Sequence, residues 1–316
     1  MIVLWTKIFK TMGKIIITIA VLLLPLMALA EAPQKETRVF AEKDGLSLKM
    51  DIYRAADAGQ KQQPCLVFVF GGGFKEGSRD WEFYTAYYNY FALRGFAVVA
   101  LDYRLGMKDA GTPGVFDTKP LRNAIQLAVD DLYSTTAYLL ENADELNIDP
   151  SKIIISGSSA GAITVLQADY QLRNAHASAA VLPEGFEYAG VISFSGGVFS
   201  TKGVPSYQTE PAPTLFFHGS ADKLVPYNKT RFFKLGMFGS ASLAKKFKKK
   251  RYPYMFYSMR DVGHEVAEYP MTDFLAEIKM FIDDFIMEGK RLMIDIKYKD
   301  KDRKSDKSIT PGSYYD

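Results

Sequence analysis

The chain has 316 residues, of which 48% are hydrophobic and 24% are charged, which is ordinary for a globular protein with a substantial core. The 39 Lys and Arg residues nearly balance 36 Asp and Glu residues, so the net charge of +3 is too small to favour nucleic acid or another polyanionic partner. The single cysteine excludes an internal disulfide framework.

Residues 1–30 have the pattern of a secretory signal peptide. Three lysines precede an apolar stretch over 15–27, and Ala28-Leu29-Ala30 supplies a small-x-small cleavage site. The apolar stretch is short for a membrane-spanning helix, and Met12 is an alternative start to Met1. We therefore expect an exported protein, periplasmic or secreted, without a stable membrane span after cleavage. The alternative is an uncleaved N-terminal anchor.

The pattern after residue 30 alternates between strands and helices. Residues 37–53 alternate in polarity around Asp44-Gly45, which predicts a β-hairpin with a tight turn. Apolar runs suit buried strands, and helical periodicity separates them. Strands are expected at 65–70, 96–101, 153–155, 191–194, 214–217 and 254–259, and helices at 81–91, 121–140, from 160 onward and at 272–287.

This alternation predicts an α/β fold with a mostly parallel central sheet, helices on both faces and an antiparallel N-terminal hairpin. We expect one domain over residues 31–289. Residues 290–316 contain eight basic and five acidic residues, which predicts a charged, partly disordered tail. The basic run 245–251 is expected to be a solvated loop, with an anionic polymer or lipid surface as the alternative partner. Cys65 lies in an apolar run and is expected to be a buried hydrophobe.

The segment Gly157-Ser158-Ser159-Ala160-Gly161 matches the G-x-S-x-G pattern. It follows the predicted strand at 153–155 and precedes a predicted helix, the context in which a serine is exposed on a strained turn. Glycines two residues to either side leave room for that turn, and the helix N-terminus favours developing negative charge. Ser159 is therefore the candidate nucleophile.

A serine nucleophile needs a base and an acid to orient the base. Of the three histidines, His264 lies in a loop after the last predicted strand, and the order 159, 222, 264 is that of hydrolase triads. Asp222 follows a predicted strand and is the candidate acid, with Asp261 as its rival. We expect His218 to shape the loop that carries the acid, and His176 lies in a polar stretch too close in sequence to the nucleophile's helix to face Ser159.

Three glycines follow the strand at 65–70, in Phe70-Gly71-Gly72-Gly73-Phe74. Backbone N–H groups of such a loop can approach a ligand closely, so Gly72, Gly73 and Ala160 are the candidate oxyanion-hole donors. No Lys-Ser/Thr follows the glycines, which argues against a phosphate-binding P-loop. The sequence has no Cys/His cluster typical of a metal site, and we expect neither a metal nor an organic cofactor.

These motifs together resemble the α/β-hydrolase esterases, above all the hormone-sensitive-lipase-like carboxylesterases and the acetyl-xylan and feruloyl esterases. The resemblance runs from about Leu46 to Met287. It implies that Ser159, Asp222 and His264 form a catalytic triad and that Gly72, Gly73 and Ala160 form the oxyanion hole. One departure is Phe70, where these families usually have a histidine that braces the glycine loop. The motifs that carry the resemblance are Gly-Gly-Gly-Phe, Asp102-Tyr103-Arg104-Leu105, Gly157–Gly161, His218–Asp222 and Gly263-His264.

The resemblance implies a serine esterase that works through an acyl-enzyme intermediate. Export favours a small-molecule or polymer-borne ester from the environment, such as acetyl or feruloyl groups on plant polysaccharide. The alternatives are a serine peptidase of the same fold and a catalytically silent binding protein on a hydrolase scaffold. The aromatic segment 81–88 either packs in the core or lines an acyl or aryl pocket.

Overall fold

The computed structural model describes residues 32–56, 58–59, 61–112, 117–303, 305–306 and 308–315. The expected signal peptide, residues 1–30, lies outside these ranges. Within them, no helix combines the length and the apolar character that crossing a membrane requires.

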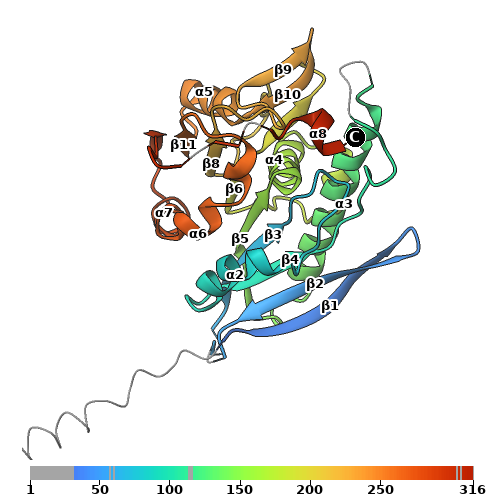
Figure 1. Cartoon of the computed structure of the whole chain (residues 1–316). Coiled ribbons are helices and arrows are strands. Elements are labelled where there is room, and N and C mark those ends of the chain that lie inside the picture. The colour runs from blue at the N-terminus through green and yellow to red at the C-terminus, as the bar shows by residue number, and fades with distance from the viewer. Residues whose placement is uncertain are drawn as a thin grey trace, which may run out of the picture.

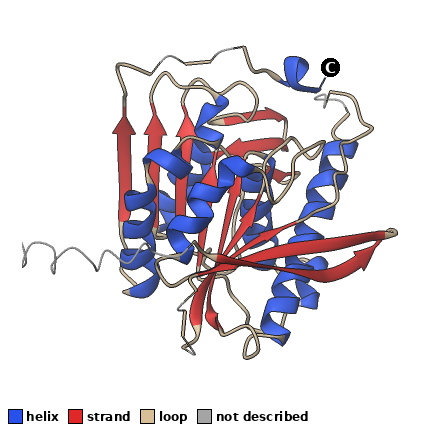
Figure 2. Cartoon of the chain, turned by 60° about the horizontal axis from the view of Figure 1, so that its bottom comes forward, coloured by secondary structure: helices blue, strands red, loops and turns tan. Residues whose placement is uncertain are grey.

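A nine-stranded sheet forms the centre of the molecule, and the helices lie on both of its faces (Figures 1 and 2). In the order of the sheet, the first two strands form the antiparallel hairpin, and the second strand also pairs antiparallel with the third. All other neighbouring strands are parallel. The predicted sheet and hairpin are thus confirmed. The strands in sheet order are β1 (Gln34–Lys43), β2 (Leu46–Arg54), β4 (Ala97–Leu101), β3 (Gln63–Val69), β5 (Ile148–Ser158), β6 (Gly190–Phe194), β8 (Thr214–Gly219), β11 (Tyr254–Met259) and β12 (Met293–Tyr298).

Helices α3 and α4 pack against each other, and α2 packs against α6. The helix predicted at 272–287 is interrupted at Phe274, and its last turns, Ile282–Met287, are a π-helix. The helices are α2 (Thr85–Ala92), α3 (Lys119–Glu141), α4 (Ala160–Leu172), α5 (Ser240–Lys250), α6 (Pro270–Asp273), α7 (Leu275–Phe281) and α8 (Pro311–Tyr315), with short 3-10 turns at Glu82–Tyr84, Ala177–Val181 and His264–Ala267.

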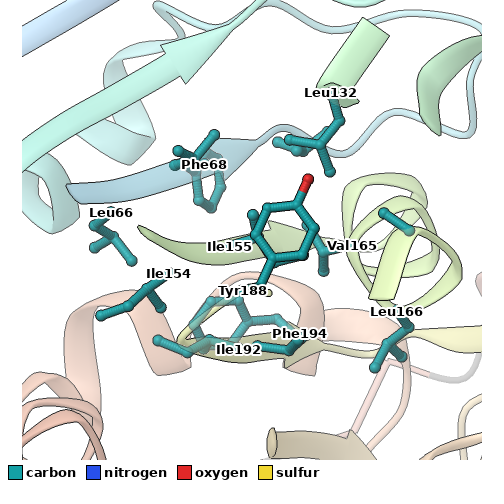
Figure 3. Close-up of a cluster of buried hydrophobic side chains, with 14 of the residues drawn as sticks. Leu66, Phe68, Leu132, Ile154, Ile155, Val165, Leu166, Tyr188, Ile192 and Phe194 are labelled. Carbon is teal, nitrogen blue, oxygen red and sulfur yellow. The ribbon is translucent and has the colours of Figure 1, made fainter. Parts of the chain in front are cut away.

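The core is built on the central strands, where apolar side chains project from both faces. Figure 3 shows Ile155 of β5 near Phe68 of β3 and Val165 of α4, and all three are fully buried. Such uniformly apolar strands are typical of a parallel sheet covered on both sides. The core therefore fixes β5, whose carboxyl end leads directly to Ser159.

The structure corrects several expectations. The basic run 245–251 is not a loop: it ends helix α5, where cations face the negative end of the helix dipole and Phe247 is buried. The tail 290–316 is not outside the fold, because Met293–Tyr298 pairs parallel with β11 as an edge strand and Pro311–Tyr315 is helical. The boundary expected at residue 289 is therefore not a domain boundary. Strand β5 begins at Ile148, ahead of the strand expected at 153–155.

A second, smaller sheet was not predicted. It is antiparallel, with the order β7 (Gly197–Ser200), β10 (Leu235–Gly239) and β9 (Lys229–Phe232). Its strands have only four or five residues. Every residue of β9 is exposed, and glycines interrupt the apolar residues of the largely buried β10, so neither strand has the continuous apolar run that identifies a buried strand.

Candidate active site

Ser159 lies on the sharp turn between β5 and α4, at a positive φ of 49°. Non-glycine residues rarely adopt this conformation, so the surrounding packing must hold it. A Cβ at Gly157 would lie 2.3 Å from the carbonyl oxygen of Gly161, and one at Gly161 would lie 2.0 Å from that of Val69. Both glycines of the G-x-S-x-G pattern are therefore required sterically.

His264 begins the short 3-10 turn after β11 and points its Nε2 at Ser159. The Ser159 Oγ lies 2.8 Å from His264 Nε2, and both side chains are largely buried. The turn is tied to the nucleophile's own strand, because the Ser158 hydroxyl donates to the Ala267 carbonyl at 2.8 Å. The pair has the spacing that transfer of a proton from a serine to an imidazole needs.

Asp222 follows β8 and holds the far side of the imidazole. Its Oδ2 lies 2.8 Å from His264 Nδ1, and its Oδ1 accepts hydrogen bonds from the amides of Leu224 and Val225 at 2.9 and 3.0 Å. Burial alone would raise the pKa of this carboxyl, but the hydrogen bonds from His218 and His264 outweigh it and hold the pKa well below its usual range. The carboxylate therefore stays charged and fixes the imidazole with a proton on Nδ1.

Two of the alternative residues, Asp261 and His176, lie away from this group. Asp261, the rival acid, is exposed and forms an ion pair with Lys299 at 2.8 Å. His176 is exposed and its Nδ1 lies 2.8 Å from the Ser178 hydroxyl. His218 is fully buried, and its Nε2 lies 3.2 Å from the Val225 carbonyl, in the loop that carries Asp222, as expected.

The glycine loop lies beside the nucleophile. Gly72 and Gly73 have positive φ values of 109° and 62°, and a Cβ at Gly72 would lie 2.0 Å from the Glu76 carbonyl oxygen. Neither amide donates to a backbone acceptor in the described part of the chain. Ala160 is the first residue of α4, where N–H groups have no partner within the helix. Gly72 and Gly73 each line a cavity that Ser159 also lines, and Ala160 follows Ser159 directly, so the three candidate oxyanion-hole residues lie around Ser159.

Aromatic side chains replace the usual bracing histidine of the glycine loop. The Phe70 ring stacks on Tyr103 with 4.3 Å between centroids, and the Tyr103 hydroxyl donates to the carbonyls of Phe70 and Gly71 at 3.1 and 3.3 Å. The Gly71 amide in turn donates to the Tyr84 hydroxyl oxygen at 3.2 Å. The loop is therefore anchored at successive peptide groups, and sequence reasoning did not identify Tyr103 or Tyr84 as its supports.

Two cavities meet at Ser159. One of them, the Ala160-side cavity, has a volume of about 420 Å³. Its walls are mainly apolar and come from α4, the loop after Asp222, the β9–β10 hairpin and Tyr315 of α8. Helix α8 lies beyond the strand ends (Figure 2). Residues that line it include Phe74, Ile163, Phe199, Leu224, Phe232 and Leu235.

The other, the His264-side cavity, has a volume of about 830 Å³. Its walls combine aromatic rings with carboxylates, among them Trp81, Tyr84, Tyr314, Glu76, Glu265 and Asp306. Of the aromatic segment 81–88, Tyr87 and Tyr88 are fully buried in the core, whereas Trp81 and Tyr84 reach this cavity. The segment thus divides between residues that pack in the core and residues that line a cavity, and an acyl or aryl ligand there stays a prediction.

Other reactive side chains lie away from the cavities. Cys65 is fully buried on β3, and burial raises the pKa of its thiol to about 12, so it is inert. Within the residues that the structure describes, no group of three or more His, Cys, Asp or Glu side chains could hold a metal ion.

The chain is similar to known proteins in both sequence and fold. Residues 50–196 match the model of the BD-FAE family. The structure of an esterase from Thermogutta terrifontis, esterase 2 in its apo form, superposes with a TM-score of 0.60 and 25% identity, covering 84% of this chain and 99% of that one. The chain has the α/β-hydrolase fold. Other structures of the same thermophilic esterase superpose with TM-scores from 0.56 to 0.58.

Several curated relatives of this α/β-hydrolase chain are named as esterases. They include Esterase B1 of Culex pipiens, 26% identical over 127 residues, and the fumonisin B1 esterase of Sphingopyxis macrogoltabida, 27% identical over 116 residues. Gut esterase 1 of Caenorhabditis briggsae is 31% identical over 108 residues. These matches cover 34–38% of this chain but only 18–21% of the relatives. The expected resemblance to α/β-hydrolase esterases is confirmed.

Proposed function

We propose that the chain hydrolyses carboxylic esters with Ser159 as nucleophile, His264 as general base and acid, and Asp222 as the group that orients the imidazole. The observation that carries this proposal is the unbroken series of hydrogen-bond distances, 2.8 Å from Ser159 Oγ to His264 Nε2 and 2.8 Å from His264 Nδ1 to Asp222 Oδ2. The esterase names of the relatives and of the superposed structure support the same reaction.

In the first half of the reaction, Ser159 Oγ attacks the ester carbonyl while His264 Nε2 takes its proton. The amides of Gly72, Gly73 and Ala160 stabilise the oxyanion of the tetrahedral intermediate. His264 then gives the proton to the leaving alkoxide, and the C–O bond breaks to leave an acyl-enzyme. Water repeats the sequence, and the carboxylic acid leaves. Each step uses only these residues and water.

The test is labelling with a fluorophosphonate probe together with hydrolysis of p-nitrophenyl acetate. The wild-type protein should react with both, and Ser159→Ala should lose both while its circular dichroism and melting temperature stay those of the wild type. Labelling that persists in Ser159→Ala would place the nucleophile elsewhere. Peptide substrates cleaved faster than esters would indicate the peptidase alternative, and a folded wild type that takes no label would indicate the silent binding protein.

For the natural substrate we propose an acetyl or feruloyl ester carried by plant polysaccharide. The support is the lining of the His264-side cavity, because carboxylates accept hydrogen bonds from sugar hydroxyls and aromatic rings pack on apolar faces. Release of acetate or ferulate from substituted xylan is the expected result. Turnover of p-nitrophenyl acetate without any such release would contradict it.

We also propose that the protein is exported, on the pattern of residues 1–30. Expression of the full chain in a bacterial host, followed by fractionation and N-terminal sequencing, should give a mature protein that begins at Glu31. Recovery in the membrane fraction with the N-terminus intact would indicate the anchored alternative.

A further inference from the structure

The C-terminal strap, by which we mean the described residues of 299–315, crosses the mouth of the cleft. Strand β12 runs parallel to β11, so its carboxyl end reaches the edge of the sheet where Ser159 lies. In Figure 2 the chain continues from there above the strand ends to α8. The strap thus starts on the side of the loop that carries His264 and ends at the glycine loop.

Specific contacts hold both ends of the strap. Near the base, the Asp306 amide donates to Glu265 Oε1 at 3.1 Å, and a Cβ at Gly263 would lie 2.5 Å from the Asp306 carbonyl oxygen. Further back, Arg303 lies over the Tyr269 ring at 3.8 Å. These contacts join the strap to the residues on either side of His264.

At the other end, the strap contacts the glycine loop directly. The Tyr315 hydroxyl donates to the Gly73 carbonyl at 2.9 Å, and Lys75 Nζ donates to the Tyr315 carbonyl at 2.9 Å. A Cβ at Gly73 would lie 2.5 Å from Tyr314 Cε1 and 2.9 Å from the Tyr315 hydroxyl oxygen. Only glycine at position 73 leaves room for the two rings, so the loop and the strap fit together.

The two tyrosines face different cavities. Tyr315 lines the Ala160-side cavity and Tyr314 lines the His264-side cavity, while Ser159 lines both. His264 Nε2 must reach the leaving oxygen to protonate it, so the alcohol belongs on the side that His264 lines. The acyl group then occupies the apolar Ala160-side cavity.

We propose that the C-terminal strap separates an acyl chamber from an alcohol chamber, with Tyr315 limiting the length of the acyl group and Tyr314 selecting the alcohol. The two are specificity-determining residues for the esterase reaction, and the inference rests on the proposed function. Removal of either ring enlarges the corresponding chamber. Because a hydrophobic pocket discriminates between substrates by the volume that it offers, an enlarged chamber should accept a larger group.

The experiment compares Tyr314→Ala and Tyr315→Ala with the wild type on two series of esters. In the acyl series, p-nitrophenyl acetate, butyrate and octanoate share the alcohol. In the alcohol series, methyl, phenyl and 2-naphthyl acetate share the acyl group. We expect Tyr315→Ala to shift the octanoate-to-acetate ratio of kcat/KM roughly tenfold toward octanoate, with the alcohol series unchanged. Tyr314→Ala should shift the naphthyl-to-methyl ratio by a similar factor and leave the acyl series unchanged.

Each variant is the matched control for the other, since both remove one ring from the same turn of α8. Tyr315→Phe keeps the ring but removes the hydrogen bond to Gly73, and should keep the wild-type acyl preference if volume is decisive. Ratios within twofold of wild type in both alanine variants, or both series changed equally by each, would overturn the proposal. If the wild type hydrolyses no ester and takes no fluorophosphonate label, the proposed function itself fails, which is a different outcome.

Discussion

His218 Nε2 lies 3.4 Å from Asp222 Oδ2, the same oxygen that faces His264 Nδ1. His218 is fully buried, its Nδ1 lies 2.8 Å from the Ser240 hydroxyl, and the Tyr227 ring packs edge-on against it at 5.6 Å. The carboxylate of the proposed triad is thus held from two sides. His218 does not reach the cavities' lining and would act through Asp222, as a positioning residue.

We predict that His218→Phe lowers kcat on p-nitrophenyl acetate roughly tenfold with little change in KM, because a hydrogen bond to a charged group is lost while ring volume is kept. The exposed His176→Phe is the matched control and should retain wild-type kcat. A His218→Phe enzyme with unchanged kcat at equal folded fraction would remove His218 from the positioning of Asp222.

Substitution of the acid should be the most costly change after loss of the nucleophile. Asp222→Asn preserves shape but favours the wrong imidazole tautomer, so kcat should fall by about four orders of magnitude. Asp261→Asn, at the surface beside Lys299, is the control and should leave kcat within twofold of wild type. The opposite ranking of the two variants would show that the rival aspartate is the acid.

The glycine loop offers a test of the oxyanion hole. Gly72→Ala forces a methyl group to within 2.0 Å of the Glu76 carbonyl oxygen at a positive φ, so the loop must move and kcat should fall roughly 100-fold or more. Gly45→Ala, also at positive φ but with open space around it, should cost only stability, about 1 kcal/mol. Equal loss of kcat in the two variants would mean that backbone strain alone, and not the position of the donors, causes the effect.

Asp222 should also contribute to the pH dependence of stability. Its pKa in the folded state is lowered, so its charged form stabilises the fold above the ordinary aspartate value of about 4, and this contribution is lost as the pH falls below that value. The difference in free energy of unfolding between wild type and Asp222→Asn should therefore be constant near neutral pH and should shrink below about pH 4. Urea denaturation at a series of pH values measures it. A difference that grows on acidification would contradict the lowered pKa.

The sequence was most informative about reactive side chains that directly follow a parallel strand. Ser159, Asp222 and His264 each follow a predicted parallel strand, and the carboxyl ends of parallel strands meet at one edge, so their order along the chain placed them in one cleft. Their catalytic roles stay a prediction. Glycines at 157 and 161 are required by contacts that the pattern already implied.

The walls of the cleft were harder to predict. Strand β9 is short and exposed, and β12 combines Asp295 and Lys297 with apolar residues at a sheet edge, so both look like solvated chain. The adjacent pair Tyr314-Tyr315 near the end of a charged tail is a sequence signal that this tail packs against something. The contact of these two tyrosines with Gly73 depends on the pairing of β12 with β11. This pairing is a parallel contact between strands distant in sequence, which hydrophobic periodicity cannot show.

The burial of Cys65 has a practical consequence. The chain has one cysteine, and its inaccessible thiol leaves the folded protein without a background reaction toward maleimide dyes. A cysteine introduced as Ile309→Cys, on the wall of the His264-side cavity, could carry an environment-sensitive fluorophore. Occupancy by non-hydrolysable alcohols could then be followed by emission, in real time and without a chromogenic leaving group.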